Sequence, residues 1–384
     1  MYNGQTPSRN KSEYWNGTIK WLSSGELNRG TVYDSIETIT EEGQKAANLK
    51  IVPKGTFVMA ITGLEAAGTR GNCALLGFDT TLNQSCMALF PKQEMLTSEF
   101  LFQWYRKVGE EYGINYTQGT KQQSYNAELI KILPISLPSV VEQRKISSYL
   151  SQLDHLITLH QRKCEQAKKL KKYMLQKMFP QNGQKVPEIR FKGFTDDWEQ
   201  RKLDNWGSFY YGRSCPKWSV TEDATIPCIR YGELYTKFGA KIDKVYSYTN
   251  MSPENLRFSK GTEVLIPRVG EDPMDYNHCT WLSMPNVAIG EMISVFNTDN
   301  NPLFTATMFN ATLQNEFAMR VEGGSVTNLY FEKLKNIEVL FPSIAEQERI
   351  AAYFERLDNL ITLHQQKCDE LKNIKKFMLQ NMFI

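Results

Sequence analysis

The chain has 384 residues, a formal net charge of +3, 41% hydrophobic and 12% aromatic residues. This length predicts two or three domains, and the composition excludes a wholly disordered protein. No apolar run approaches the ~20 residues of a membrane span, the first residues do not resemble a signal peptide, and the seven cysteines contain no Cys-x-x-Cys pair. We therefore expect a cytoplasmic protein without membrane contact, disulfide framework or zinc ribbon.

Residues 1–137 are predicted to form a first mixed α/β domain. The apolar run Phe57–Ile61 suggests a strand, Thr97–Tyr112 suggests an amphipathic helix, and glycine-containing turns separate the segments. Residues 138–180 are predicted to form one long helix. Pro138 precedes Ser139 as a candidate N-cap, and apolar residues then recur every seven positions.

A polar linker with proline and glycine follows, and residues 181–341 are predicted to contain this linker and a second mixed α/β domain. Residues 342–384 form a second predicted helix. Over 42 positions, Pro342–Phe383 is identical to Pro138–Phe179 at 24, at a constant offset of 204 residues. The chain therefore arose by duplication, with two nearly constant helices and two diverged domains.

Each predicted helix carries a two-track apolar stripe that it cannot bury alone. We predict that the helices pair as an antiparallel intramolecular coiled coil about 60 Å long. Its seam, which is also the candidate docking surface for a partner, comprises Ile146, Leu150, Leu153, Ile157, Ile350, Phe354, Leu357 and Ile361. His160, Cys164, His364 and Cys368 lie on this seam as two i, i+4 pairs, and either a zinc site or a polar layer that fixes the register would suit them.

Several short motifs resemble a known family. Pro187–Phe194 followed by Trp198–Leu203, Lys20–Leu27, and Ile229–Leu234 resemble segments of the recognition domains of type I restriction–modification specificity subunits. The Glu-Gln, Leu-Asp and lysine-rich pattern of both helices resembles the spacers of that family. The resemblance covers nearly the whole chain. One departure is that Pro187–Tyr211 has no counterpart before Gly4, so the first domain is expected to lack its opening strand and turn, and either another segment completes it or the domain is a shortened form.

The resemblance implies a non-catalytic subunit that binds double-stranded DNA. In that family, two methyltransferase subunits using S-adenosylmethionine and two restriction/translocase subunits using ATP and Mg²⁺ supply the chemistry, so we expect no cofactor, metal or catalytic residue in this chain. The sequence agrees, because it has no Gly-x4-Gly-Lys-Ser/Thr loop for ATP, and Asn301-Pro302-Leu303-Phe304 lacks the second proline of an adenine methyltransferase motif. A self-contained DNA-modifying enzyme and a coiled-coil adaptor without DNA binding remain as alternatives.

DNA binding requires cations for phosphates and planar polar groups for base edges. A solvated surface would also account for such side chains, so each candidate stands as a hypothesis. In the first domain the candidates are Arg9, Lys11, Lys20, Ser23, Arg29, Arg70, Lys121, Gln122 and Gln123. In the second domain they are Arg213, Lys217, Arg230, Tyr231, Arg268, Asn277 and His278.

Overall fold

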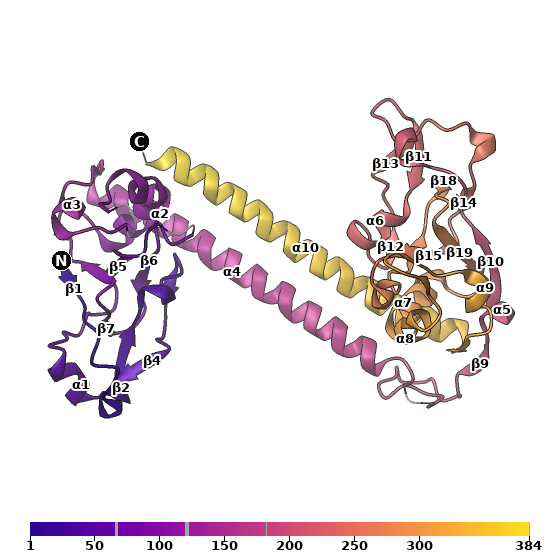
Figure 1. Cartoon of the computed structure of the whole chain (residues 1–384), viewed down its shortest axis with the longest axis horizontal. Helices are drawn as coiled ribbons and strands as arrows, with labels where there is room; N and C mark the ends of the chain where they lie inside the picture. The colour runs from indigo at the N-terminus through magenta and orange to yellow at the C-terminus, as the bar shows by residue number, and fades with distance from the viewer. Residues whose placement is uncertain (66–67, 120–122, 182, 384) are drawn as a thin grey trace. The chain divides into compact units, whose positions relative to one another are not determined.

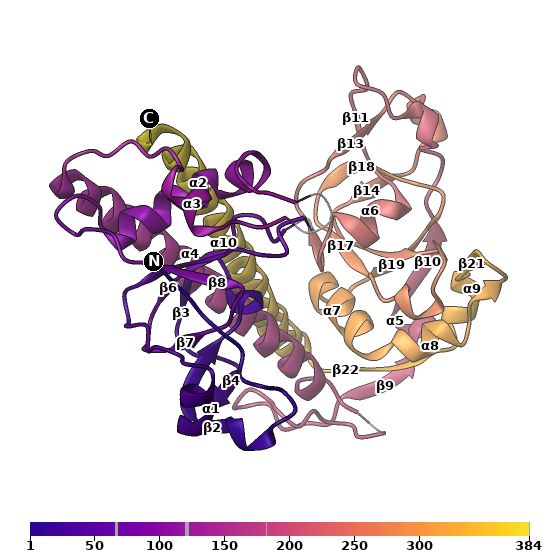
Figure 2. The ribbon, with the colours of Figure 1, turned by 60° about the vertical axis from the view of Figure 1, so that its left-hand side comes forward.

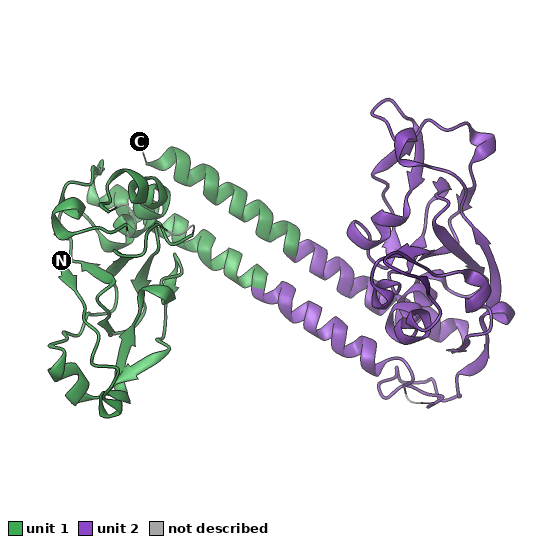
Figure 3. Ribbon diagram, in the orientation of Figure 1, with its two compact units in different colours: residues 1–161, 365–384 green, residues 162–364 purple. Residues whose placement is uncertain are grey.

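The computed structural model describes the chain except residues 66–67, 120–122, 182 and 384. The chain divides into two compact units (Figure 3): unit 1 comprises residues 1–161 and 365–384, and unit 2 comprises residues 162–364. The division falls within both long helices, so each unit contains one globular domain and a part of each helix. The domain limits predicted from the sequence stay predictions.

Unit 1 contains a five-stranded and a three-stranded sheet (Figure 1). The strand order is β1-β8-β5-β6-β3 in the larger sheet, where β3 and β6 are parallel and the other pairs antiparallel, and β4-β2-β7 in the smaller one. The elements are β1 (Tyr2–Asn3), β2 (Trp15–Leu22), β3 (Thr31–Val32), β4 (Glu37–Ile39), α1 (Glu41–Ala46), β5 (Phe57–Ala60), β6 (Cys73–Leu76), β7 (Thr81–Leu82), β8 (Cys86–Leu89), α2 (Ser98–Asn115), α3 (Ala127–Lys131) and the first part of α4 (Val140–Lys177).

Unit 2 is a larger version of the same kind of domain (Figure 2). It begins with the end of α4, followed by β9 (Glu199–Lys202), α5 (Leu203–Trp206), β10 (Gly207–Tyr211), β11 (Ile226–Ile229), α6 (Tyr231–Thr236), β12 (Lys241–Ile242), β13 (Ser247–Thr249), β14 (Phe258–Lys260), β15 (Glu263–Pro267), β16 (Val269–Gly270), β17 (Thr280–Leu282), β18 (Pro285–Ile289) and β19 (Ile293–Thr298). It ends with α7 (Pro302–Thr312), α8 (Gln314–Ala318), β20 (Glu322–Gly323), β21 (Thr327–Asn328), α9 (Phe331–Leu334), β22 (Glu338–Phe341) and the first part of α10 (Ile344–Met382).

The two domains share one strand topology. The order β10-β19-β15-β17-β12 in unit 2 repeats β1-β8-β5-β6-β3, and β13-β11-β18 repeats β4-β2-β7, with β14 added at the edge. The parallel pairs also recur, since β12 pairs with β17 as β3 pairs with β6. The predicted mixed α+β class is confirmed, and the duplication seen in the helices extends to the domains.

The predicted opening of the first domain needs one correction. Tyr2 and Asn3 pair with β8 just as β10 pairs with β19, so the first domain does have a short counterpart of β10. Each of these strands is followed by a glycine in a tight approach, since a Cβ at Gly4 or Gly212 would lie 2.0 Å from a carbonyl oxygen. At the entry to the domain, the feature without a counterpart in the described part of unit 1 is the pair formed by β9 and β22.

Both helix starts are built in the same way. Ser139 Oγ accepts a hydrogen bond from the Glu142 amide and Ser343 Oγ one from the Glu346 amide, which confirms the predicted N-caps. One turn later, the buried Gln143 accepts a hydrogen bond from the Thr97 amide at 3.0 Å and donates to the carbonyls of Met95 and Pro138. These bonds lock the first helix to the loop before α2.

Gln347 has the same role in unit 2. Its Oε1 accepts from the Asn301 amide at 2.9 Å, and its Nε2 donates to Asn300 and to the Pro342 carbonyl. Thr97 and Asn301 are themselves the N-caps of α2 and α7, so each glutamine joins two helix starts. The Glu-Gln motif of the repeat is therefore the joint between domain and helix.

Candidate nucleic-acid interface

In the second domain, the turn between β18 and β19 brings three of the predicted cations together. The Arg213 amide donates to the Ile289 carbonyl at 2.8 Å, and the Arg268 amide donates to the Met292 carbonyl at 3.2 Å. Gly290, in the same turn, donates to the Ile229 carbonyl directly before Arg230. Backbone bonds thus fix the positions of three arginines that are far apart in the sequence.

Aromatic rings hold the side chain of Arg268. Its guanidinium carbon lies 4.7 Å from the centre of the Tyr211 ring and 5.3 Å from that of Tyr330, within the range of a cation–π interaction. The Tyr211 hydroxyl donates to Glu332 at 2.7 Å, and burial together with this bond raises the pKa of Tyr211 to about 12. Tyr211 therefore stays a neutral donor at physiological pH and supports Arg268 without adding charge.

Arg230 and Tyr231 lie at the start of α6. The Arg230 amide donates to Glu233 Oε2 at 3.0 Å, and Ser247 Oγ donates to the other oxygen of this carboxylate. These bonds make the backbone under Arg230 rigid, while the Tyr231 side chain is exposed. Lys217 is also exposed, beside Trp218, whose side chain is 70% exposed. Exposed cations next to exposed rings suit contacts with a phosphate backbone.

Asn277 and His278 are engaged within the fold. Asn277 Nδ2 donates to the Asn310 carbonyl at 3.1 Å, and the His278 ring lies 5.2 Å from the ring of Tyr235. Both residues are half-buried. Their predicted role in DNA binding stays a prediction, and one amide hydrogen of Asn277 already has a structural partner.

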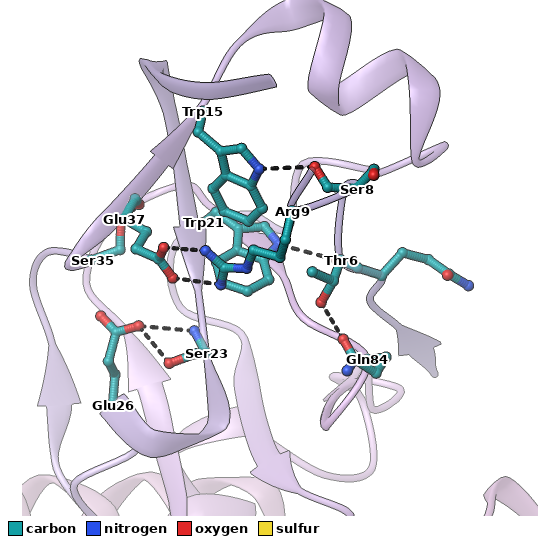
Figure 4. A network of polar contacts seen from close by, with 11 residues as sticks. Thr6, Ser8, Arg9, Trp15, Trp21, Ser23, Glu26, Ser35, Glu37 and Gln84 are labelled. Atoms are coloured by element: carbon teal, nitrogen blue, oxygen red, sulfur yellow. Dashed lines mark hydrogen bonds and ion pairs between the residues drawn. The ribbon is translucent and has the colours of Figure 1, made fainter. Parts of the chain in front are cut away.

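In the first domain, the guanidinium of Arg9 is surrounded by partners (Figure 4). It forms a two-pronged ion pair with Glu37, with Nη2 at 2.9 Å from Oε2, and lies 3.8 Å from the centre of the Trp15 ring. The hydrogen bond from Arg9 lowers the pKa of Glu37, so the pair stays charged. Trp21, 5.1 Å from the guanidinium, donates from Nε1 to the Gln5 carbonyl. Arg9 thus holds the segment before β2 against Trp15 and Trp21 of that strand and against Glu37 of β4.

Neighbouring candidates in the first domain also have intramolecular partners. Lys20 forms an ion pair with Asp34 at 2.6 Å, and Lys11 donates to the Tyr14 hydroxyl at 3.0 Å. Ser23 donates from both its amide and its hydroxyl to Glu26, at the position that Arg230 occupies in the second domain. This part of the surface is closer to electrical neutrality than the sequence suggested.

Arg29, Arg70 and Gln123 form a second group. Arg29 has a left-handed backbone (φ 58°), and its Nη2 donates to the Arg70 carbonyl at 2.5 Å. Arg70 in turn donates to Gln123 Oε1 at 3.1 Å. Two arginines and an amide that are dispersed in the sequence therefore lie together, as a DNA contact requires. Lys121 and Gln122 lie outside the described residues.

Sequence reasoning missed two equivalent loops. The loop between β3 and β4 contains Tyr33, whose side chain is 76% exposed, and the exposed Ile36. In the second domain, Tyr246 lies between β12 and β13, with Lys237 and Lys244 each 5.4 Å from the centre of its ring. The signal that could have identified these loops is an aromatic residue in a turn between two very short strands. Exposed rings with nearby ammonium groups are suited to stacking against nucleic acid.

The predicted seam residues are mostly buried. All four from α4, together with Ile350, Phe354 and Leu357 from α10, are buried, and Ile361 is half-buried. In unit 1, Asp154 on α4 contacts Lys375 on α10 and lies 2.5 Å from Arg106 of α2. In unit 2, the repeat-equivalent pair Lys171 and Asp358 lies at 2.5 Å. Polar pairs at matching positions therefore accompany the apolar stripe.

In unit 1, the three charged side chains of Arg106, Asp154 and Lys375 lie close together. Burial and the nearby Arg106 lower the pKa of Lys375 to about 8, although Asp154 opposes this shift. Burial raises the pKa of Asp154, but the two cations lower it more, so its pKa lies below the usual range. The carboxylate is thus the group that permits two cations to be buried side by side.

Comparisons with known proteins show which family the chain belongs to. The family model described as the type I restriction modification DNA specificity domain matches residues 2–169 and 283–373, more than half of the chain. The chain belongs to this family. The recognition made from the sequence motifs is therefore confirmed.

Individual relatives agree with the family match. The chain is similar to the type I restriction enzyme MjaIX specificity subunit of Methanocaldococcus jannaschii, with 24% identity over 99% of this chain and 89% of that protein. It is also similar to the EcoR124I/EcoR124II specificity subunit of Escherichia coli, with 28% identity over 40% of this chain and 38% of that protein. The S subunit from M. genitalium has the same fold, with a TM-score of 0.62 and 14% identity, covering all of this chain and 93% of that one.

Two further findings concern the other hypotheses. Within the described ranges, no group of three or more His, Cys, Asp or Glu side chains is arranged to hold a metal ion. Cys164 is buried, with its Sγ 3.8 Å from the Ile361 carbonyl oxygen, and Cys368 is also buried. The zinc hypothesis therefore gains no geometric support here. Among the described helices, none is long and apolar enough to span a membrane.

Proposed function

We propose that each of the two domains reads one half of a bipartite DNA target, and that the two long helices set the gap between the half-sites. The observation that carries this proposal is the duplication of the whole unit of domain, glutamine joint and helix. A single polypeptide with two copies of one fold but different polar surfaces is suited to reading two different short sequences. Cations and exposed rings on both domains support contacts with the phosphates and bases.

We further propose that α4 and α10 form an antiparallel coiled coil. In unit 2, Cys164 contacts Ile361 and Lys171 contacts Asp358, so the residue numbers of the contacts rise along α4 and fall along α10. In unit 1, Asp154–Lys375 follows the same rule. The 38 residues of α4 correspond to a helix roughly 57 Å long, compared with about 34 Å for one turn of DNA. Half-sites about one turn apart lie within the reach of such a spacer.

We assign the chemistry to partner subunits. The proposed assembly has two methyltransferase subunits using S-adenosylmethionine and two restriction/translocase subunits using ATP and Mg²⁺, with this chain as the non-catalytic DNA-reading component. Exposed apolar residues on the helices, among them Tyr149, Leu156 and Leu360, offer docking surfaces for partner helices. Family membership favours this function over a self-contained DNA-modifying enzyme and over an adaptor without DNA binding.

The spacer hypothesis can be tested by lengthening both helices. One heptad inserted after Gln161 and one after His364 preserves the apolar stripe and adds roughly 10 Å, or about three base pairs. The variant is co-expressed with its methyltransferase partner, and methylated adenines are mapped across the genome. We expect a wider gap and unchanged half-sites, whereas an unchanged gap would contradict the proposal. A heptad in one helix alone is the matched control and should abolish methylation, because the register is lost.

The alternatives have their own tests. Methylation or nicking of DNA by the purified chain alone would support a self-contained enzyme. Failure to find any sequence-specific methylation with the partner present would favour the adaptor. Either result would contradict the proposed function.

A further inference from the structure

A cavity of about 490 Å³ lies in unit 1 where the end of α10 meets the first domain, and most of the side chains that line it are basic. Lys107 of α2 donates to the Phe383 carbonyl, and Asp154 of α4 contacts Lys375 of α10, so three helices form its walls (Figure 1). The cations that line this helix-end cavity are Arg29, Arg106, Lys107, Lys372, Lys375 and Lys376. Asp154 is the one acidic side chain among the described residues that line it.

The positive charge of the helix-end cavity is only partly neutralised. Asp154 is shared by Arg106 and Lys375. Lys372 lies 3.9 Å from Asp369, but both side chains are about half exposed, and such pairs are screened by water. Within the described residues, no ion pair is formed by Arg29, Lys107 or Lys376.

The buried Cys73 thiol is close to three of these cations and adds no counter-charge. Burial raises the pKa of Cys73 to about 12, although Arg106, Arg29 and Lys375 each lower it. The thiol is therefore neutral at physiological pH. The helix-end cavity is thus suited to bind an anion from outside the chain.

Unit 2 has the lysines of the helix but not the cations of the domain. The repeat relates α2 to α7, and the strand pairing relates β3 to β12. In unit 2, the positions of Arg29, Arg106 and Lys107 are occupied by Gly239, Asn310 and Ala311. The side chain of Asn310 bonds to the backbone of Cys279, with Nδ2 donating to the carbonyl at 2.8 Å and Oδ1 accepting from the amide at 2.7 Å. The concentration of cations is therefore specific to unit 1.

Arg29 connects the helix-end cavity to the candidate base-reading group of the first domain. Its Nη2 donates to the Arg70 carbonyl at 2.5 Å, and Arg70 donates to Gln123 Oε1 at 3.1 Å. The cavity and this group thus share one arginine. Because phosphates flank every base of a DNA strand, a strand read by this group brings phosphates to the same part of unit 1.

We propose that the helix-end cavity binds a backbone phosphate of DNA beside the half-site read by the first domain, and that the other half-site has no equivalent contact. The inference rests on the proposed DNA-reading function. The buried Lys375 and the half-buried Arg106 supply fixed positive charge, and the exposed Lys107 and Lys376 supply donors that can reach the phosphate. The end of α10 thus takes part in DNA binding as well as in setting the gap.

The test measures binding of a duplex by the full chain with its methyltransferase partner at several salt concentrations, with the target found by methylation mapping. Lys376→Gln should weaken binding by about tenfold and reduce the slope of log affinity against log salt by about 1, because one phosphate contact is lost. The matched control is Lys172→Gln, the repeat counterpart on α4, which is also exposed and should change neither quantity. An unchanged slope for Lys376→Gln, or equal reductions for both variants, would overturn the proposal.

Uncharged methylphosphonates, placed one at a time along the duplex, identify the source of the phosphate. The wild type should lose about tenfold in affinity at one or two positions beside one half-site only, and Lys376→Gln should lose nothing further there. Additive losses at every position would overturn the assignment to the DNA backbone. Titration with ATP in the absence of DNA tests a free nucleotide. Binding that Lys376→Gln abolishes, without a sensitive position in the duplex, would also overturn that assignment.

The outcomes separate this inference from the function on which it rests. If the wild-type complex binds no duplex site-specifically, the DNA-reading function itself is contradicted. If the complex binds its target and Lys376→Gln binds with the same salt slope, the function stands and the helix-end cavity is not a phosphate site.

Discussion

Between the two domains, the joints to the long helices have diverged little and the polar surfaces have diverged strongly. The joints are nearly identical, since Gln143 and Gln347 each accept a hydrogen bond from the amide of the preceding N-cap residue and donate one to the proline carbonyl ahead of their own helix. Only the third bond differs, because it goes to the Met95 carbonyl in unit 1 and to the Asn300 side chain in unit 2. The polar surfaces are different. Arg9 is neutralised by Glu37, whereas Arg213 is exposed and, in the described part of the chain, forms no ion pair. The duplicated chain thus preserved the contacts that position each domain, while the surfaces proposed to face DNA diverged.

The largest expected effect lies at the residue that unit 2 has and unit 1 lacks. Trp198→Ala removes a buried ring that packs against both Phe179 and Phe304, and it should lower the free energy of unfolding of unit 2 by about 4 kcal/mol. Urea unfolding monitored by exchange in residues 302–312 measures this loss. The control Trp218→Ala removes an exposed ring and should change the stability by less than about 0.5 kcal/mol. Similar losses for both variants would contradict the importance of the β9 segment.

The second prediction compares Asp154 with its repeat counterpart Asp358. Asp154 contacts two cations and Asp358 one. Asp154→Asn leaves Arg106 and Lys375 together without a counter-charge and should destabilise unit 1 by about 3 kcal/mol. Asp358→Asn should cost unit 2 about 1 kcal/mol, because Lys171 can turn toward solvent. Thermal unfolding of both variants gives the ranking, and a reversed order would refute the crowding argument.

The glutamine joints should behave alike. Gln143→Leu removes the partner of the Thr97 amide and of the Met95 and Pro138 carbonyls. Gln347→Leu removes the partner of the Asn301 amide, the Asn300 side-chain oxygen and the Pro342 carbonyl. Each change should lower stability by about 2 kcal/mol. Denaturant unfolding of the two variants tests this equality. A difference of more than about 1 kcal/mol would show that the two joints are not energetically equivalent.

DNA binding should separate the two arginines. Arg213→Ala should weaken binding by about tenfold and reduce the slope of log affinity against log salt by about 1, because an exposed guanidinium is free to neutralise a phosphate. Arg9→Ala should leave the slope nearly unchanged, because Glu37 already neutralises that cation. Binding of the chain with its methyltransferase partner, measured at several salt concentrations, decides between them. Equal salt slopes for the two variants would contradict the proposed difference between the two surfaces.

A last comparison concerns the dependence of stability on pH. The pKa of Lys375 is lowered from 10.5 to about 8 in the folded chain, so the unfolded chain binds more protons between these values. The stability of unit 1 should therefore rise as the pH increases from about 8 to 10.5. Lys375→Met removes this contribution, and the wild type should gain stability relative to it over that range. Chemical unfolding at several pH values measures the difference, and a fall with rising pH would contradict the shift.

The sequence by itself determined the duplication, the helices and their N-caps, and the mixed α+β class. These features depend on local signals, namely the repeat at an offset of 204 residues, the seven-residue spacing of apolar residues and the proline–serine starts. It also indicated that the segment around Trp198 has no counterpart within residues 1–137. The helix predicted for Thr97–Tyr112 is α2, which begins at Ser98 with Thr97 as its cap.

Only the tertiary structure decided which candidate cations have partners and which strands are covered. Arg9 and Arg213 have the same chemistry in the sequence, but Glu37 reaches Arg9 because β4 pairs with β2, a contact between residues 28 positions apart. Glu142 and Glu346 are likewise equivalent in the repeat, and only the folded chain shows one exposed and the other paired with Arg190. Such long-range pairing has no local signature, because it depends on which strands and loops the fold brings together.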